Sequence, residues 1–405
     1  MNILMISPQP FFSPRGTPYS VYYRALIASE FGIKIDLLTY GEGQDTDLNN
    51  VRIIRIPRIR AFEPIKIGPS LPKLVLDFIL MIWTIILLCK NKYQIVHAHE
   101  EAVFFCLILK PIFRFKLIYD MHSSLPQQLT NFSFTKSKVL IQIFKKLEDS
   151  CLKAADAIIT ICPDLCQYVN SVIQNKKKHF LIENSIFDFV KLRKTQSITE
   201  RTASNNLSYI TNPIDIPKNK RIVVYAGTLE SYQGIDILIE AFSKVVQTYT
   251  DAFLLIVGGQ PHQVKYYKER ANKNGLEDFS LFTGKVPQQL AKYYISKASV
   301  LVSPRSEGTN TPLKIYEQIN SGIPLVATNI YSHTQVLNDK VAFLVQPKPD
   351  CMAVGICEAL KPNGKGLVIA QNAKRLYESQ YDRGAYEAKM RSIFQYITRC
   401  GVLTC

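Results

Sequence analysis

Short runs of apolar residues alternate with helical periodicity along most of the chain. In the first half, runs of strand length cover 2–6, 33–38, 51–56, 94–98, 116–119, 156–161 and 180–182. Helical patterns between them cover 18–31, 72–90, 101–109, 136–154 and 163–173. Continuous apolar strands that alternate with helices are typical of parallel sheets with crossover helices.

The alternation restarts after a polar stretch at 191–220. Strand patterns then cover 222–226, 253–257, 280–282, 300–303, 324–327 and 341–345, and helical patterns cover 234–249, 288–297, 312–320 and 385–399. We therefore expect two Rossmann-like, doubly wound α/β domains facing across a cleft. The expected boundaries are 1–185 for the first domain, 186–220 for a linker or surface insertion, 221–384 for the second domain, and 385–405 for a closing helix that could return to the first.

The charge balance suggests an anionic partner. The 405 residues carry 49 Lys and Arg against 33 Asp and Glu, a net charge of +16. Such an excess suits nucleic acid, an acidic membrane or a phosphorylated ligand. With 47% hydrophobic and 20% charged residues, disorder, collagen and coiled coil are excluded as the main state.

The nine cysteines predict free thiols in a reducing compartment, because their number is odd and no Cys-x-x-Cys occurs. One segment, 74–89 (LVLDFILMIWTIILLC), is unusually apolar between two lysines. Sixteen helical residues cover about 24 Å, less than the roughly 30 Å of a bilayer core. We favour a buried domain helix, ahead of a helix in the membrane interface and of a membrane span.

The stretch most informative about chemistry is 303–324 (SPRSEGTNTPLKIYEQINSGIP), which follows an apolar strand and opens a helix at Pro312. Backbone N–H groups at such a start, around Leu313 and Lys314, face an anion with the helix dipole behind them. The Lys314 ammonium adds a charge, and the Glu317 carboxylate could accept two ribose hydroxyls. A capped amphipathic helix with a solvated glutamate would carry the same residues.

This stretch resembles the donor-binding loop and helix of the retaining glycosyltransferases of family 4, which have the two-domain GT-B fold. In that family two glutamates, eight positions apart in E-G-F-G-x-x-x-x-E-A-M-A-x-G-x-P, lie near the donor's sugar and ribose. Glu317 matches the second glutamate, and 318–324 (QINSGIP) match the tail. Position 309 is Thr309, and Glu307 lies ten positions before Glu317. Either Glu307 reaches the sugar through a longer loop, or Thr309 and Asn310 make those hydrogen bonds.

Other segments resemble landmarks of the same family in order and spacing. They are 94–99 (QIVHAH), 119–122 (YDMH), 155–160 (ADAIIT), 182–185 (IENS), 225–229 (YAGTL) through 233–234 (QG), 254–261 (LLIVGGQP) and 282–286 (FTGKV). The basic pair usual in the first donor loop is missing, since its positions are Thr228 and Gln233. Arg305 and Lys314 are the nearest cations in sequence that could neutralise the departing diphosphate instead.

The resemblance implies a set of site residues. His122, expected at the mouth of the cleft, would contact the donor sugar and stabilise charge in the transition state, with Lys314 and Glu307 as the other catalytic residues. A satisfied histidine in a strand-end loop is the alternative for His122. The implied donor-binding residues are Gly16, Thr17, Gly227, Thr228, Gln233, Arg305, Gly308, Thr309, Asn310, Thr311, Pro312, Leu313 and Glu317.

His97 and His99 would point to one face of a strand, a spacing compatible with a metal. No third ligand is evident nearby in the sequence, and the resemblance implies no bound metal. Packing at a strand end is the interpretation we favour.

The resemblance implies a metal-independent, retaining transferase that moves a hexose from a GDP-, UDP- or ADP-linked sugar to an acceptor hydroxyl. The acceptor would be a sugar, a lipid-linked saccharide or a polysaccharide, in glycolipid, polysaccharide or other glycoconjugate synthesis. We expect no cofactor, no nucleic-acid partner, and a place in the cytoplasm or peripherally on an anionic membrane. Two alternatives stay open: a nucleotide-sugar epimerase or phosphorylase on the same fold, and an inactive basic relative that binds membranes or nucleic acid.

Overall fold

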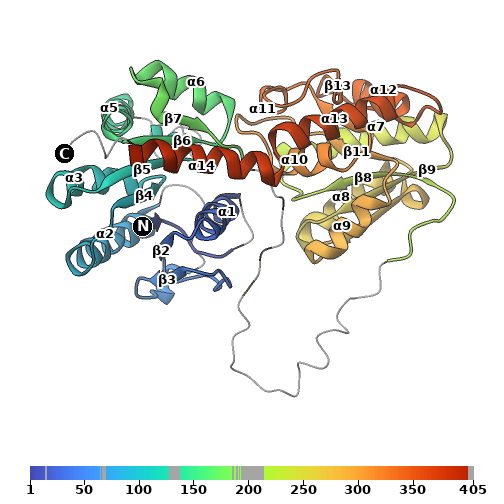
Figure 1. Cartoon of the computed structure of the whole chain (residues 1–405). Coiled ribbons are helices and arrows are strands. Elements are labelled where there is room, and N and C mark those ends of the chain that lie inside the picture. The colour runs from blue at the N-terminus through green and yellow to red at the C-terminus, as the bar shows by residue number, and fades with distance from the viewer. Residues whose placement is uncertain are drawn as a thin grey trace. The chain divides into compact units, whose positions relative to one another are not determined.

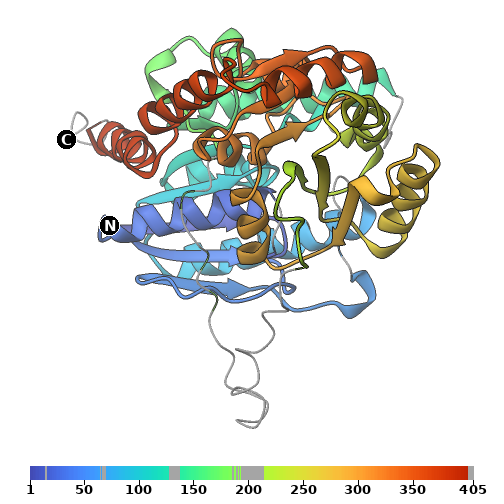
Figure 2. The same cartoon turned by 90° about the vertical axis from the view of Figure 1, so that its right-hand side faces the viewer.

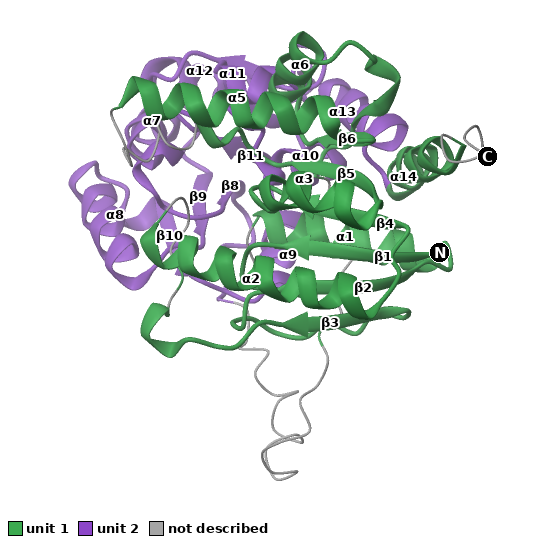
Figure 3. Cartoon of the chain, turned by 90° about the vertical axis from the view of Figure 1, so that its left-hand side faces the viewer, with its two compact units in different colours: residues 1–195, 383–405 green, residues 196–382 purple. Residues whose placement is uncertain are grey.

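The chain folds into two compact units. The computed structural model describes residues 1–13, 16–63, 65, 70–126, 137–184, 187, 190, 192 and 214–399. Unit 1 comprises 1–195 and 383–405, and unit 2 comprises 196–382, as coloured in Figure 3. Most of the linker expected at 186–220 lies outside the described residues.

Unit 1 is built on a parallel sheet with the strand order β3-β2-β1-β4-β5-β6-β7 (Figure 1). Its strands are β1 (Asn2–Ser7), β2 (Lys34–Thr39), β3 (Val51–Arg55), β4 (Ile95–His99), β5 (Lys116–Met121), β6 (Ala157–Thr160) and β7 (His179–Leu181). The order reverses between β1 and β4. In open α/β sheets, ligands bind beyond the carboxyl ends of the strands at such a reversal.

Helices cover both faces of this sheet, because alternate strand residues point to opposite sides. One face carries α1 (Gly16–Glu30) and α14 (Arg383–Arg399), which bury Ile3 and Met5 of β1. The other face carries α2 (Leu71–Lys90), α3 (Ala102–Phe113), α5 (Lys138–Ala154) and α6 (Pro163–Val172). The closing helix of the chain, α14, therefore belongs to unit 1.

Unit 2 has a parallel sheet with the order β10-β9-β8-β11-β12-β13. Figure 2 draws this unit in yellow-green to orange-red. Its strands are β8 (Arg221–Ala226), β9 (Ala252–Val257), β10 (Ser280–Gly284), β11 (Val300–Ser303), β12 (Leu325–Thr328) and β13 (Phe343–Val345). The order reverses between β8 and β11. The loops that follow these two strands therefore lie where a doubly wound sheet binds its ligand.

Two helix layers enclose the sheet of unit 2. One layer contains α7 (Ile235–Thr248), α8 (Pro261–Lys273) and α12 (Pro349–Leu360). The other contains α9 (Gln288–Ser296), α10 (Leu313–Asn320) and α13 (Gly366–Gln380), and α11 (Tyr331–Thr334) is a single turn after β12. The expected class, two doubly wound parallel α/β units, is confirmed.

Four helices are not predicted from the sequence, namely α8, α11, α12 and α13. The sequence of α8, PHQVKYYKERANK, is mostly polar, and the helix buries only Tyr267 and Ala271. Such a sparse apolar stripe gives a weak periodic signal. The sequence predicts no element between 345 and 385, where α12 and α13 lie.

The expectation that 74–89 form a buried helix is wrong. The α2 helix begins after Ser70, whose hydroxyl accepts a hydrogen bond from the Lys73 N–H, and it runs for 20 residues. Only 28% of its most apolar 18-residue window is buried. By length and composition it is the one helix among the described residues that could cross a membrane. One side packs in the core of unit 1 and the other is exposed.

The packing of α14 on unit 1 predicts a measurable loss of stability. Ile393 lies on α14 and is fully buried. Ile393→Ala should lower the free energy of unfolding of unit 1 by about 2–5 kcal/mol, because the cavity does not refill. Gln395→Ala, at an exposed position on the same helix, is the matched control. Equal denaturation midpoints for the two variants would contradict the packing.

Candidate functional site

The two loops beyond the strand reversal of unit 2 touch each other backbone to backbone. The first runs from Gly227 through a short 3-10 turn at Ser231–Gln233. Gly234 ends that turn with a φ of +71°, and a Cβ atom there would lie 2.0 Å from the Pro304 carbonyl oxygen of the second loop. Only glycine allows this approach and this backbone conformation.

The second loop, 304–312, joins β11 to α10 and is held from three sides. The Ser306 N–H donates to the Tyr232 carbonyl at 2.9 Å. The Thr328 hydroxyl donates to the Arg305 carbonyl, and the side-chain amide of Gln335 donates to the Thr309 carbonyl. These contacts fix the path of the loop up to the helix start.

A lysine from the second loop's helix reaches the first loop. Lys314 Nζ donates a hydrogen bond of 3.0 Å to Gln233 Oε1 and lies 4.4 Å from the centre of the Tyr225 ring. Burial, with a further contribution from the nearby Arg305 charge, lowers the pKa of Lys314 to about 7. A cation that is this poorly solvated gains strongly from an anionic ligand.

Arg305 is the second cation at this edge. Its Nε donates to the Glu307 carbonyl at 2.5 Å, and its guanidinium lies 5.2 Å from the centre of the Tyr232 ring. Burial lowers the pKa of Arg305 as well. Two partly desolvated positive charges therefore meet at the carboxyl ends of β8 and β11.

The amino end of α10 is not capped by a side chain. Pro312 precedes the helix in an extended conformation, with φ −67° and ψ 135°. The buried Thr311 hydroxyl has no hydrogen-bond partner among the described residues. One turn on, Glu317 is half-buried, and burial raises the pKa of its carboxyl despite the opposing charge of Lys292. The arrangement offers N–H and cationic groups to an anion and a carboxylate to hydroxyls.

The structure gathers most of the sequence-predicted donor residues within unit 2. Glu307 and Thr228 are exposed at the loop tips, and Thr309 and Asn310 are half-buried. Gly308 has a φ of +131°, and a Cβ atom there would lie 2.1 Å from Arg305 Nη2. At Gly227, a Cβ atom would lie 3.7 Å from Lys314 Nζ.

Three predicted residues belong to unit 1. Gly16 and Thr17 begin α1, and the two residues before them lie outside the described part of the chain. His122 follows β5, which extends to Met121, two residues further than the pattern predicts. This extension carries His122 inside unit 1, where it is 3% exposed. Its side chain is thus buried within unit 1, and its expected contact with the donor sugar at the mouth of the cleft stays a prediction.

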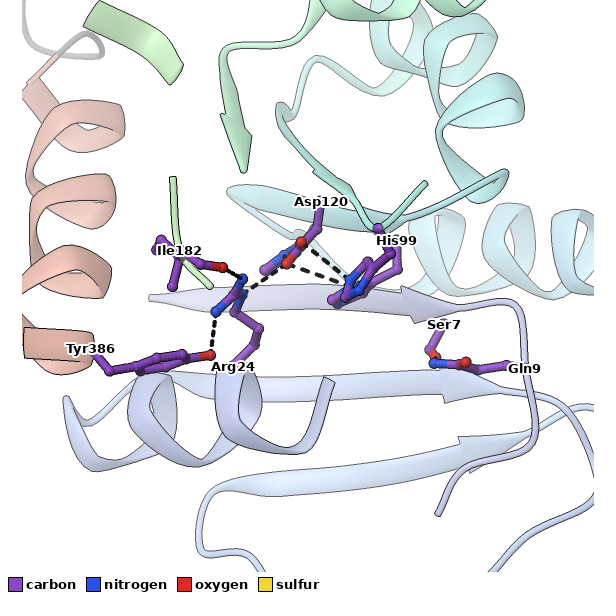
Figure 4. Close-up of polar contacts among 9 residues, drawn as sticks. Ser7, Gln9, Arg24, His99, Asp120, Ile182 and Tyr386 are labelled. Carbon is purple, nitrogen blue, oxygen red and sulfur yellow. Dashed lines mark hydrogen bonds and ion pairs between the residues drawn. The ribbon is translucent and has the colours of Figure 1, made fainter. Parts of the chain in front are cut away.

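His122 is part of a buried polar cluster around Asp120. Figure 4 shows Arg24 and His99 beside Asp120 in this cluster. Arg24 Nε lies 3.0 Å from Asp120 Oδ2, which His97 Nε2 also contacts at 3.0 Å. His122 Nε2 lies 3.2 Å from Asp120 Oδ1 and 3.1 Å from His99 Nδ1.

The same cluster ties three distant segments together. The Arg24 guanidinium of α1 donates to the Ile182 carbonyl at 3.0 Å and to the Tyr386 hydroxyl of α14. Burial alone would raise the pKa of Asp120, but Arg24 and the neighbouring imidazoles bring it well below its usual range. Burial lowers the pKa of His97 and His99. The cluster is therefore an ionised pair with two neutral imidazoles stacked beside it.

Asp120 is the third potential metal ligand that the sequence analysis did not find. One ligand atom each from His97, His99 and Asp120 lie within 4.8 Å of one another. However, the Arg24 charge contacts the same carboxylate oxygen, and a divalent cation would have to approach that guanidinium. The residues fit a buried ion pair better than a metal centre.

Arg24, Tyr232 and Tyr386 were also missed. They lie far apart in sequence from the groups that they contact, and no local pattern marks them. Only the apolar context of α1 could have indicated that Arg24 is buried.

Two family models match the chain. The model of "Glycosyl transferases group 1" matches residues 210–376, and that of "Glycosyltransferase Family 4" matches residues 16–186. Together they cover most of both units.

Curated relatives and solved structures agree with these matches. The chain is 23% identical over 427 residues to a phosphatidylinositol N-acetylglucosaminyltransferase component of Arabidopsis thaliana, covering 99% of this chain and 86% of that one. It is 28% identical over 148 residues to a phosphatidyl-myo-inositol mannosyltransferase of Mycobacterium tuberculosis, covering 36% and 38%.

Among solved structures, sucrose-phosphate synthase from Thermosynechococcus elongatus has a TM-score of 0.70 at 18% identity, covering 98% of this chain and 99% of that one. Anabaena Alr3699/HepE, in complex with UDP and glucose, has a TM-score of 0.65 at 16% identity, covering 98% and 99%. At these identities the likeness shows the fold.

The buried ion pair gives a stability prediction. Asp120→Asn should lower the free energy of unfolding of unit 1 by about 3–5 kcal/mol at pH 7, because it leaves the Arg24 charge buried without its counter-ion. The pKa of Asp120 is lowered in the folded state, so its contribution is present above the unfolded pKa, about 3.9, and is lost as pH falls through the folded pKa. The difference in the free energy of unfolding between the wild type and Asp120→Asn should therefore become smaller in acid.

Chemical denaturation at pH 7 and pH 3 measures this effect. Glu63→Gln is the control, since it breaks an exposed ion pair with Arg58 that water already screens. An Asp120→Asn variant as stable as Glu63→Gln would contradict the ionised pair.

Proposed function

We propose that this chain, which belongs to glycosyltransferase family 4 and has the GT-B fold, is a retaining, metal-independent hexosyltransferase. Its donor is a nucleoside-diphosphate sugar and its acceptor a hydroxyl group of a glycolipid. The observation that carries the donor assignment is Lys314, a desolvated cation beside Gln233 at the reversal between β8 and β11.

The diphosphate is held by groups of unit 2. Lys314 and Arg305 take the place of the basic pair that the family has at Thr228 and Gln233. Together with the N–H groups at the start of α10, they offset about two negative charges on the leaving group. Each positioned donor of this kind contributes about 2–4 kcal/mol in a site that excludes water. The Glu317 carboxylate then accepts hydrogen bonds from the ribose hydroxyls.

Transfer proceeds with retention by attack on the face that the diphosphate leaves. The bond from the anomeric carbon to the phosphate oxygen breaks, and the bond to the acceptor oxygen forms. The acceptor proton passes to the departing phosphate, so no protein base is required. Positive charge on the sugar ring is stabilised by the diphosphate itself, which Lys314 and Arg305 hold in place.

The names of the similar proteins suggest where to begin. The solved neighbours in complex with UDP and with UDP-glucose make a uridine donor the first to test, before GDP- and ADP-linked sugars. The phosphatidylinositol-directed relatives support a glycolipid acceptor at the cytoplasmic face of a membrane.

Epimerisation or phosphate-dependent release of the donor without acceptor would favour the epimerase or phosphorylase alternative. The anomeric configuration of the product, followed by NMR, distinguishes retention from inversion.

Removing the two charged residues of α10 tests the donor site. Lys314→Ala and Glu317→Ala should each lower kcat/KM by about 30- to 1,000-fold, the loss of one positioned interaction. The fold should be intact, because both side chains lie at the rim of the core. Product formation from nucleoside-diphosphate sugars measures the effect, with Lys361→Ala and Glu269→Ala as exposed controls. Full activity in both α10 variants would show that the site is elsewhere.

The pKa of Lys314 predicts the pH dependence of donor binding. Lys314 titrates near pH 7 in the free protein, and a bound diphosphate favours its charged form. Affinity for a nucleoside-diphosphate sugar, whose two esterified phosphates do not titrate near neutral pH, should therefore be constant below pH 7 and fall up to tenfold per pH unit above it, with proton uptake on binding. Calorimetry in buffers of different ionisation enthalpy measures both quantities. Lys314→Arg should flatten the profile, and an unchanged profile in that variant would exclude Lys314 as its source.

A further inference from the structure

Three neighbouring helices of unit 1 expose an apolar face. Ten of the twenty large hydrophobic residues that the described chain exposes lie on α2, α3 and α5. They are Leu71, Leu74, Val75, Phe78, Ile82, Ile86, Ile108, Ile112, Val139 and Ile143. The α3 helix packs against both α2 and α5, and Figure 3 shows the three in one layer of unit 1. Such a concentration marks a surface that is covered in use.

The outward positions of α2 follow the helical repeat from Leu71 through Phe78 to Ile86. On an ordinary surface helix this stripe would be polar. The only charge between Lys73 and Lys90 is Asp77, which turns inward and accepts a hydrogen bond from the Tyr40 hydroxyl. The exposed stripe therefore carries no charge over its whole length.

The inner side of α2 is part of the unit 1 core, so the helix is not a membrane span. Leu76, Leu80 and Leu87 are buried in that core. Lys73 pairs with Glu101 beside α3. A span would have to leave these contacts, whereas a helix lying in the membrane interface keeps them and buries only its outward side.

The charges around the apolar face have one sign. Residues 71–155 contain eleven Lys and Arg and six Asp and Glu. None of the six acidic residues is exposed, whereas seven basic residues are, and these seven make no ion pair with a described residue. Lys90 lies one turn beyond Ile86, and Lys146 lies three residues after Ile143, on the same sides of their helices.

We propose that this apolar face docks on an anionic lipid bilayer, with its hydrophobic side chains at the acyl boundary and its lysines at the headgroup phosphates. The described part of this face exposes positive charge alone, which complements the uniformly negative headgroup surface of an anionic bilayer. The docking does not depend on the donor chemistry. Its corollary, that the acceptor hydroxyl is presented from the lipid surface, rests on the proposed function.

Vesicle flotation with the full chain tests the contribution of the exposed hydrophobic side chains to membrane binding. The protein should bind phosphatidylcholine vesicles that contain phosphatidylglycerol. Phe78→Gln/Ile108→Gln removes two side chains that are 59% and 66% exposed, and it should weaken binding about tenfold or more. Leu367→Gln/Val368→Gln, at exposed positions on α13 of unit 2, should bind as the wild type does.

A second variant and its control test the contribution of the exposed lysines to membrane binding. Lys90→Gln/Lys146→Gln should weaken binding to the anionic vesicles about 30-fold, from roughly 1 kcal/mol for each of the two lysines. Lys265→Gln/Lys268→Gln, exposed on α8, should not. Added salt should reduce the difference.

Three results would overturn the proposal. The first is that the wild-type protein does not float with the vesicles, and the second is that Phe78→Gln/Ile108→Gln and Lys90→Gln/Lys146→Gln both float as the wild type does. The third is a wild-type dimer, seen by light scattering, that Phe78→Gln/Ile108→Gln dissociates. The last would mean that a second copy covers the face. Nucleotide binding measured on the same samples separates this test from that of the donor site, because surface variants should leave it unchanged.

Discussion

The hydrogen bond from Lys314 to Gln233 joins the two loops on which the function of unit 2 depends. It crosses the reversal between β8 and β11, where the helices on either side diverge and leave backbone groups exposed. The glycine at 234 permits the loops to touch, and Thr328 and Gln335 hold the second loop in place. Without this junction, the cations and the start of α10 would not face the same point.

The two units use buried charge in opposite ways. In unit 1, Arg24 and Asp120 are fully buried but neutralise each other, and they connect α1 and α14 with the end of β5. This cluster contributes to structure and positions His122. In unit 2, Lys314 and Arg305 have no carboxylate partner among the described residues, and burial lowers the pKa of both. A site with uncompensated positive charge is suited to a diphosphate.

The fold was predictable because parallel strands are continuous apolar runs and need no long-range information. The start of α10 was predictable for the same reason: Pro312 follows an apolar strand and a short loop. Contacts between residues far apart in sequence were not. Nothing near His97 indicates Asp120 or Arg24, and nothing near Gln233 indicates that Lys314 lies 3.0 Å away.

The apolar segment at 74–89 shows a further limit. Composition alone cannot distinguish a helix buried on all sides from one buried on one side, because both are uniformly apolar. The structure decides between them through the neighbours of α2, which cover Leu80 and leave Phe78 exposed.

The central claim is that a diphosphate binds at the junction of the two loops. A crystal structure of the full chain with a bound nucleoside diphosphate tests it most directly. We expect phosphate oxygens within hydrogen-bonding distance of Lys314 Nζ and of the backbone N–H groups that begin α10. A nucleotide bound elsewhere on unit 2, with the Lys314–Gln233 contact unchanged and its surroundings vacant, would contradict the account.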